Sequence, residues 1–265
     1  MDNQRLISIA AGVSPELADD PCTFVELAAE AGWRGTGVWY APSSWTAKTT
    51  REISRRVKDT GLTVVDMEVV RMGPGGDCGE GLIEAAATIG AKNVLTISQF
   101  DEIEATAERL NELCTFARAF DIRICLEFMR FTTVQTLADA LRVVQIVDQD
   151  NVGILVDLIH VFRSGTTYEE IRAADPSCFP YAQWCDAPSE PCGWSTKELI
   201  RDALDDRSIP GEGDMPVNEF ESLFDLTVPF SVEVRSKALR DGFPDFLERA
   251  QHLLSATSTA MTFTS

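Results

Sequence analysis

The sequence predicts an α/β protein, a single (β/α)8 TIM barrel, and two observations carry this prediction. Short apolar runs alternate with amphipathic stretches eight times along 265 residues, a length typical of one such barrel. The apolar runs are nearly continuous, as in parallel strands that are buried on both faces. A doubly wound sheet usually has fewer strands. We expect one domain over residues 1–265, with a loose tail at about 255–265.

The expected strands are short runs rich in Val, Ile, Leu and aromatic residues, bounded by glycine, proline or charged residues. The second begins at a glycine, and the third, LTVVDMEVVRM, is the longest. The fifth and sixth, RICLEFM and VGILVDLIH, are aliphatic runs interrupted by single acids. In chain order we place the strands at Leu6–Gly12, Gly35–Tyr40, Leu62–Met72, Lys92–Phe100, Arg123–Met129, Val152–His160, Pro180–Asp186 and Phe230–Arg235.

Between the strands, apolar residues recur at helical spacing. The first and third amphipathic stretches end at a glycine, a common helix terminator. After the seventh strand comes a longer excursion, which contains one helix and the loop IPGEGDMP. The expected helices are Phe24–Gly32, Thr46–Thr60, Gly79–Gly90, Asp101–Phe120, Val134–Asp148, Tyr168–Ala174, Thr196–Leu204 and Phe243–Leu254.

Charge and composition exclude several classes of partner. With 23 basic and 42 acidic residues, the formal net charge is −19. A nucleic acid or an acidic membrane surface needs a basic footprint, so we expect neither as a partner. We see no signal-peptide pattern and no apolar run of membrane-spanning length, so we expect a cytoplasmic protein. Its seven cysteines are then reduced thiols, and two histidines are too few for a zinc cluster.

Acidic residues occur at equivalent places in three expected strands. Glu127 ends RICLE, Asp157 ends GILVD and Glu233 ends FSVE. An unpaired carboxylate in an apolar run is costly to bury, and active sites of such barrels lie at the carboxyl ends of the strands. A divalent cation at the barrel mouth explains all three acids, although any single one could form a structural ion pair. Gln183 occupies the matching place in the seventh strand, and this oxygen-rich set favours Mg²⁺ or Mn²⁺ over zinc.

His160 follows Asp157 in a D-x-x-H pattern, so its imidazole is expected at the same mouth. Five segments in order, LEFM, VDLIHVFRSG, YAQWCDAP, PGEGDMP and SVEV, resemble the xylose-isomerase-like TIM-barrel superfamily, most closely its sugar phosphate isomerase/epimerase branch. The resemblance implies a metal held by Glu127, Asp157, Gln183 and Glu233, with His160 in contact with substrate. At the third position the family more often has histidine. The nucleic-acid-cleaving branch of the superfamily has more histidines than this chain.

The resemblance implies an enzyme that isomerises or epimerises a hydroxyketone, either a keto-sugar or a related cyclic ketone. Such enzymes remove the proton next to the carbonyl and stabilise the enediolate with the metal. Glu127 and Glu233 are the expected bases, and His160 polarises the carbonyl or moves the proton. A dehydratase of the inosose or 3-dehydroshikimate type with the same metal ligands is the alternative enzyme. A non-catalytic binding or accessory barrel is the third possibility.

The expected pocket wall is aromatic and basic. We assign Trp39, Phe128 and Trp184 to it as apolar contacts, and Arg71 and Arg235 as contacts to a carboxylate, phosphate or hydroxyl group. Glu68 is a secondary candidate base. This wall predicts a small-molecule substrate with an apolar face. The sequence is also compatible with a homo-oligomer.

Overall fold

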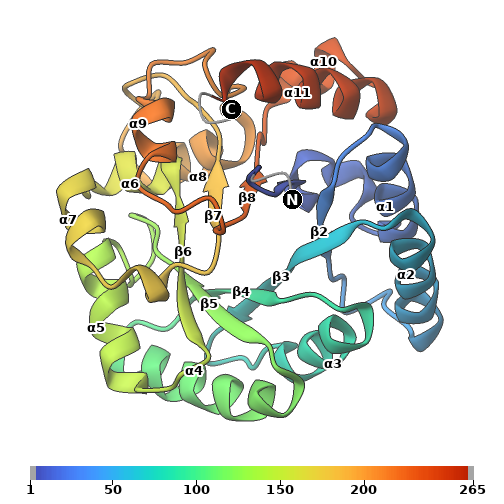
Figure 1. The fold of residues 1–265 in the computed structure, drawn as a ribbon. Coiled ribbons are helices and arrows are strands. Elements are labelled where there is room, and N and C mark those ends of the chain that lie inside the picture. Colours follow the sequence, from blue (N-terminus) through green and yellow to red (C-terminus); the bar gives the residue numbers. More distant parts are fainter. Residues whose placement is uncertain (1–3, 262–265) are drawn as a thin grey trace.

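In the computed structural model, which describes residues 4–261, eight parallel strands form a closed barrel in chain order. This confirms the predicted TIM barrel. The helices form an outer ring around the strands (Figure 1). The strands are β1 (Ile7–Ile9), β2 (Gly35–Trp39), β3 (Thr63–Met72), β4 (Asn93–Ser98), β5 (Arg123–Glu127), β6 (Val152–Asp157), β7 (Ala182–Trp184) and β8 (Phe230–Val232).

Side-chain caps explain where several helices begin. Thr46, Thr136, Thr167 and Ser195 each form a capping box with the residue three positions later, which satisfies backbone N–H groups of the first turn. The α-helices are α1 (Pro21–Glu30), α2 (Ala47–Thr60), α3 (Gly79–Ile89), α4 (Ile103–Ala117), α5 (Leu137–Val147), α6 (Leu158–Ser164), α7 (Tyr168–Ala173), α8 (Thr196–Asp205), α9 (Val217–Glu221), α10 (Lys237–Gly242) and α11 (Phe246–Ala260). Short 3₁₀ turns lie at Ala11–Val13, Pro15–Leu17, Arg118–Phe120 and Pro176–Cys178.

Three predictions of local structure are corrected by these bounds. His160 lies on helix α6 and not at the end of a strand, because Asp157 caps that helix by accepting a hydrogen bond from the Ile159 amide at 3.1 Å. The short helices α9 and α10 were not expected. Residues 255–260, expected in a loose tail, continue α11 because Leu253 and Thr257 are fully buried. Residues 262–265 of that expected tail lie outside the described residues.

The strands separate two apolar layers. Their outer faces pack under the helices and form the main hydrophobic core. A smaller cluster contains residues of β3 to β6 and Tyr181, the residue before β7: Val65, Val69, Leu95, Cys125, Leu155 and Tyr181. Because side chains alternate along a strand, the last three share a face with Glu127, Asp157 and Gln183, two residues further on. The barrel therefore has an apolar layer beneath its polar mouth.

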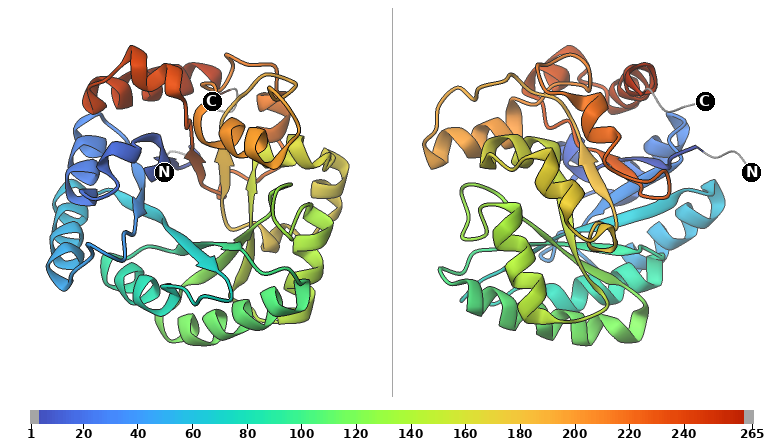
Figure 2. Two further views of the ribbon diagram at one scale, coloured as in Figure 1. Left: turned by 180° about the vertical axis from the view of Figure 1, so that it is seen from behind. Right: turned by 60° about the vertical axis from the view of Figure 1, so that its left-hand side comes forward.

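The two ends of the described chain meet where the barrel closes. β1 pairs with β8, and the Arg5 guanidinium donates hydrogen bonds to the carbonyls of Asp225 and Val228 at 2.8 and 2.7 Å. Helices α1 and α11 lie side by side (Figures 1 and 2), where Phe24 stacks on Phe246 at 4.9 Å. Closure thus joins the first strand to the last strand and the first α-helix to the last α-helix.

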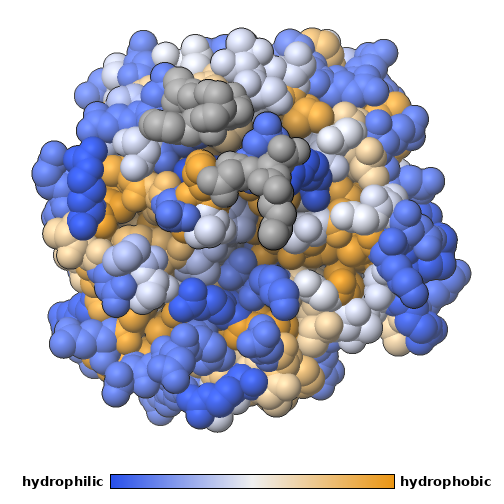
Figure 3. Space-filling model, in the orientation of Figure 1, coloured by the Kyte–Doolittle hydropathy of each residue, from blue (hydrophilic) through white to orange (hydrophobic). Residues whose placement is uncertain are grey.

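The outer surface follows the amphipathic pattern of the helices. On the face shown in Figure 3, hydrophilic residues cover most of the periphery, with hydrophobic residues scattered between them. Among residues 4–261, we find no helix with both the length and the apolar character needed to cross a membrane.

Candidate active site at the barrel mouth

The structure brings the four expected metal ligands together at the carboxyl ends of the strands. Glu127 ends β5, Asp157 ends β6, Gln183 lies in β7 and Glu233 directly follows β8. Asp157 and Gln183 are partners in the β6–β7 register, so their side chains lie next to each other. All four residues are buried. The alternation of the strands, which aims one residue in two at the barrel axis, produces this convergence.

The guanidinium group of Arg207 forms ion pairs with two of these carboxylates. Its guanidinium is 2.7 Å from Asp157 Oδ2 and 2.9 Å from Glu233 Oε2, and the residue is buried. Burial alone would lower the pKa of Arg207, but the two carboxylates outweigh it and raise this pKa. The mouth therefore holds a permanent positive charge that the sequence analysis did not assign to it.

The loop after β7 explains why Arg207 reaches the mouth. Asp186 and Ser208 exchange backbone hydrogen bonds at 2.9 and 2.8 Å, and the Arg207 amide donates to the Arg235 carbonyl at 3.2 Å. The Asp186 carboxylate also accepts hydrogen bonds from the amides of Gly211, Gly213 and Met215. A Cβ atom at Gly213 would lie 2.3 Å from Asp186 Oδ1, so the segment PGEGDMP needs this glycine to wrap around the carboxylate.

The donor atoms fit a divalent cation. The outer end of the Gln183 amide lies 3.3 Å from both Asp157 Oδ2 and Glu233 Oε2. With its nitrogen turned inward, Gln183 donates to both carboxylates. With its oxygen turned inward, Gln183 adds a neutral oxygen donor that a divalent cation could share with the two carboxylates. Potential ligand atoms of Glu127, Asp157 and His160 also lie within 4.8 Å of one another.

Burial raises the pKa values of several acids at and below the mouth. The pKa of Glu127 lies well above the ordinary value. Desolvation is the largest cause, and the charges of Asp157 and Glu233 follow. The pKa of Glu233 is also raised, although Arg207 opposes this shift. Deeper in the barrel, burial raises the pKa of Asp66 to about 8. Carboxyl groups in this state can take up and return protons near neutral pH.

His160 faces this cluster as an uncharged imidazole. Its Nε2 lies 3.7 Å from Glu127 Oε1 and 3.9 Å from Asp157 Oδ2, both beyond hydrogen-bond reach. The edge of the Phe131 ring packs against the imidazole, with ring centroids 5.8 Å apart. Burial, and then the charge of Arg207, lower the pKa of His160 to about 3.

We therefore expect His160 to remain neutral in the folded protein from pH 8 down to about pH 4. Between its ordinary pKa of 6.5 and about 3, the unfolded chain binds a proton that the folded chain does not. His160 thus reduces the free energy of unfolding by about 1.4 kcal/mol for each pH unit of acidification in this window. Imidazole ¹⁵N spectra of the metal-free protein test this, with His252→Gln to assign the two rings. A His160 signal that titrates above pH 5 contradicts it.

A cavity of about 210 Å³ opens above these groups. It is lined by the expected residues Trp39, Glu68, Arg71, Glu127, His160, Glu233 and Arg235, together with Arg207, which was not expected. Apolar side chains of Met129, Phe131, Ile200 and Leu204 form other parts of its wall. The cavity therefore combines acids, guanidinium groups and an apolar wall.

Phe128 and Trp184, expected in this wall, lie elsewhere. Both are fully buried in the main core between strands and helices, and Trp184 packs against Phe230 at 5.8 Å. Each is the neighbour of a side chain that faces the barrel axis, Glu127 and Gln183 respectively. Because successive side chains of a strand point to opposite faces, both aromatic rings must face the helices.

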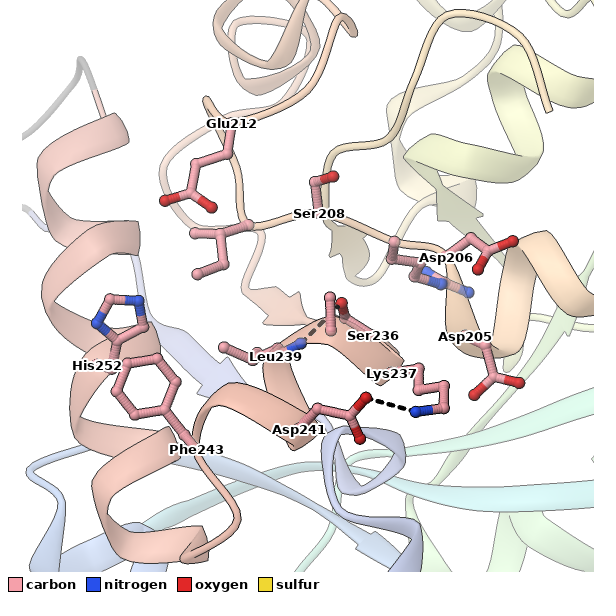
Figure 4. A pocket seen from close by; sticks show the side chains of 13 residues that line it. Asp205, Asp206, Ser208, Glu212, Ser236, Lys237, Leu239, Asp241, Phe243 and His252 are labelled. Atoms are coloured by element: carbon pink, nitrogen blue, oxygen red, sulfur yellow. Dashed lines mark hydrogen bonds and ion pairs between the residues drawn. The ribbon is translucent and has the colours of Figure 1, made fainter. Parts of the chain in front are cut away.

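A larger hollow of about 640 Å³ (Figure 4) shares Arg207 with the cavity at the mouth but contains none of the four expected metal ligands. It lies between α10, α11 and the segment after α8. Lys237 pairs with Asp241 there, Arg240 nearby pairs with Asp205 at 2.5 Å, and Phe243 stacks on His252 with ring centroids 4.3 Å apart. Lys237, Asp241, Arg240 and Asp205 are thus engaged with one another in and beside this hollow.

The fold and the residues at its mouth define a TIM barrel with an acid-rich polar centre. The comparison with protein families points to the same kind of barrel. A family model described as xylose isomerase-like TIM barrel matches residues 25–253. The chain belongs to this family.

Individual relatives match less of the chain. The inosose isomerase of Bacillus subtilis (strain 168) is 29% identical over 144 residues, 51% of this chain and 49% of that protein. The chain thus spans about half the length of the curated relatives it matches. A structure described as the IOLI protein with a bound zinc atom has a TM-score of 0.77 and 18% identity, over 96% of this chain and 95% of that one. The probable 3-DHS dehydratase AsbF from Bacillus anthracis has a TM-score of 0.70 and 17% identity, over 94% and 98%. At these identities, the structural likeness shows the fold alone.

Proposed function

We propose that this protein isomerises or epimerises a hydroxyketone, a keto-sugar or related cyclic ketone, by removing the proton next to the carbonyl group. The observation that carries the proposal is the buried group of Glu127, Asp157, Gln183 and Glu233 beside an uncharged His160, at the base of a cavity. The match to inosose isomerases over half of the chain supports the same chemistry.

The four residues would hold one divalent cation, Mn²⁺ or Mg²⁺, because carboxylate and amide oxygens suit these hard ions. When bound, the cation acts as a Lewis acid that stabilises negative charge on the substrate's carbonyl oxygen. The similarly folded IOLI protein is described with a bound zinc atom, which supports a metal in a barrel of this kind. Arg207 orients two of the ligands through its contacts with Asp157 and Glu233.

Glu127 and Glu233 are the candidate bases. Their raised pKa values bring proton uptake closer to neutral pH, where general acid–base groups work best. One removes the proton, and the other returns it to the opposite face or to the neighbouring carbon. His160, which is neutral, hydrogen-bonds the substrate oxygen or moves a proton between oxygens.

A dehydratase of the inosose or 3-dehydroshikimate type is the second candidate. The first step is the same, after which the carboxyl group that took up the proton gives it to a hydroxyl group that leaves as water, while the neutral His160 hydrogen-bonds a substrate oxygen. The raised pKa values of Glu127 and Glu233 suit this proton return, and the fold likeness to the probable 3-DHS dehydratase supports the route.

Metal analysis and proton exchange test the proposal together. After reconstitution with Mn²⁺, we expect about one ion per chain in the wild type and none in the Asp157→Asn, Glu233→Gln double variant. The exposed Glu30→Gln is the matched control. With inosose in D₂O, NMR should show exchange of the proton next to the carbonyl. Exchange without loss of water identifies the isomerase, exchange with water release identifies the dehydratase, and no exchange with any ketone in a panel overturns both.

A further inference from the structure

Two arginines at the cavity flank one indole ring. Arg71, near the end of β3, has its guanidinium carbon 5.7 Å from the centre of the Trp39 ring, and Arg235, after β8, has its own 5.9 Å from it. All three residues line the 210 Å³ cavity. Burial, and then the positive charge of Arg235, lower the pKa of Arg71.

These two guanidinium groups lack the partners that other arginines near the mouth have. Arg163 pairs with Asp202 at 2.8 Å, and Arg207 pairs with Asp157 and Glu233. Within residues 4–261, neither Arg71 nor Arg235 forms an ion pair or a side-chain hydrogen bond, and the buried Nε of Arg235 has no acceptor. Acidic residues outnumber basic ones by 42 to 23 in this chain. Two neighbouring arginines that both lack a carboxylate partner are therefore an unusual feature.

The nearby acids are already engaged. Glu68 Oε1 accepts a hydrogen bond from the Ala11 amide at 3.2 Å, and Glu233 is held by Arg207 at 2.9 Å. Gly12 keeps room between these groups, because a Cβ there would lie 2.8 Å from Glu233 Oε1 and 3.1 Å from Arg235 Cδ. The terminal guanidinium N–H groups of Arg71 and Arg235, which have no partner among the described residues, therefore remain free for a ligand in the cavity.

We propose that Arg71 and Arg235 bind a carboxylate group carried by the substrate, with Trp39 as the flat wall behind it. This inference rests on the proposed function, since it names the class of hydroxyketone: a small cyclic acid. A guanidinium group matches the planar geometry of a carboxylate. The cavity volume equals that of roughly seven water molecules, which suits a single substituted ring.

Binding measurements on matched ring compounds test this inference separately from catalysis. Quinate carries a carboxylate on a hydroxylated six-membered ring, myo-inositol has no charge, and myo-inositol monophosphate carries a phosphate. Calorimetry on the wild type, both loaded with Mn²⁺ and metal-free, should show quinate binding about tenfold or more tighter than myo-inositol. Arg71→Gln and Arg235→Gln should each remove this preference, whereas Arg51→Gln, an exposed arginine on α2, should keep it.

Salt gives a second measurement that needs no variant. The preference for quinate should shrink when NaCl rises from about 0.05 M to about 0.5 M, because the cavity is open to solvent ions. Equal affinities for quinate and myo-inositol, or a preference that both substitutions leave unchanged, overturn the proposal. Tighter binding of the phosphate than of quinate overturns the assignment to a carboxylate. If neutral ketones exchange their protons while quinate shows no preference, the carboxylate site is wrong and the proposed function stands.

Discussion

Replacing His160 with glutamine should lower turnover by about 10²–10⁴-fold, the usual contribution of a general acid–base group. Metal content and melting temperature should stay nearly unchanged. The nearest acidic oxygens are 3.7 and 3.9 Å from the imidazole, so the substitution breaks no hydrogen bond to them. Turnover per folded molecule, bound Mn²⁺ and thermal unfolding are measured on the same preparation.

His252→Gln is the matched control, because His252 lies in the separate hollow beside Phe243 and should leave turnover unaffected. A structural histidine behaves differently: its loss lowers stability by roughly 1–3 kcal/mol through partners left unpaired. A destabilised His160→Gln protein with normal turnover per folded molecule would show that His160 is a packing residue.

Replacing Arg207 with methionine should produce the largest loss of stability. The change leaves Asp157 and Glu233 buried without their cationic partner, and breaking a buried pair in this way typically costs about 3–5 kcal/mol. Denaturant unfolding of the metal-free protein measures this loss. Saturating Mn²⁺ should restore part of it, because a cation that binds only the folded state stabilises that state and replaces the missing positive charge.

Arg163→Met provides the comparison, since Arg163 and Asp202 form a buried pair of similar geometry at 2.8 Å. This variant should lose a similar amount of stability, but Mn²⁺ should restore no more than it adds to the wild type. If Mn²⁺ raises the stability of both variants equally, Arg207 and the cation do not share ligands, and the site described here is incorrect.

The barrel could be predicted because its determinants are local. Eight apolar runs separated by amphipathic stretches are visible in the sequence, and each strand lies within an expected range. Glu127, Asp157 and Glu233 could be chosen because charge is unexpected in such runs. Phe128 and Trp184 were misplaced although the information was available: once Glu127 and Gln183 face the axis, their neighbours must face outward.

Arg207 could not be found in this way. It lies in an irregular segment with no periodicity, and its position depends on backbone pairing of that segment with residues far along the chain, including Arg235. Only the excess of carboxylates at the mouth hints that a cationic side chain is needed there. The end of α11 was missed for a similar reason, since Thr257 is polar in the sequence but fully buried against the core.

The hydrogen bonds that the Arg5 guanidinium donates to the segment before β8 have a consequence for the order in which the chain folds. Its carbonyl partners lie 220 and 223 residues away, so closing the ring between β1 and β8 costs about 5 kcal/mol in loop entropy, beyond a constant. At about 5–20 residues per second, a ribosome needs roughly 10–45 s to make the intervening chain. Throughout that time β1 has an unpaired edge, which is a known route to aggregation. The ring therefore closes late, and the edge of β1 stays unpaired until β8 forms beside it.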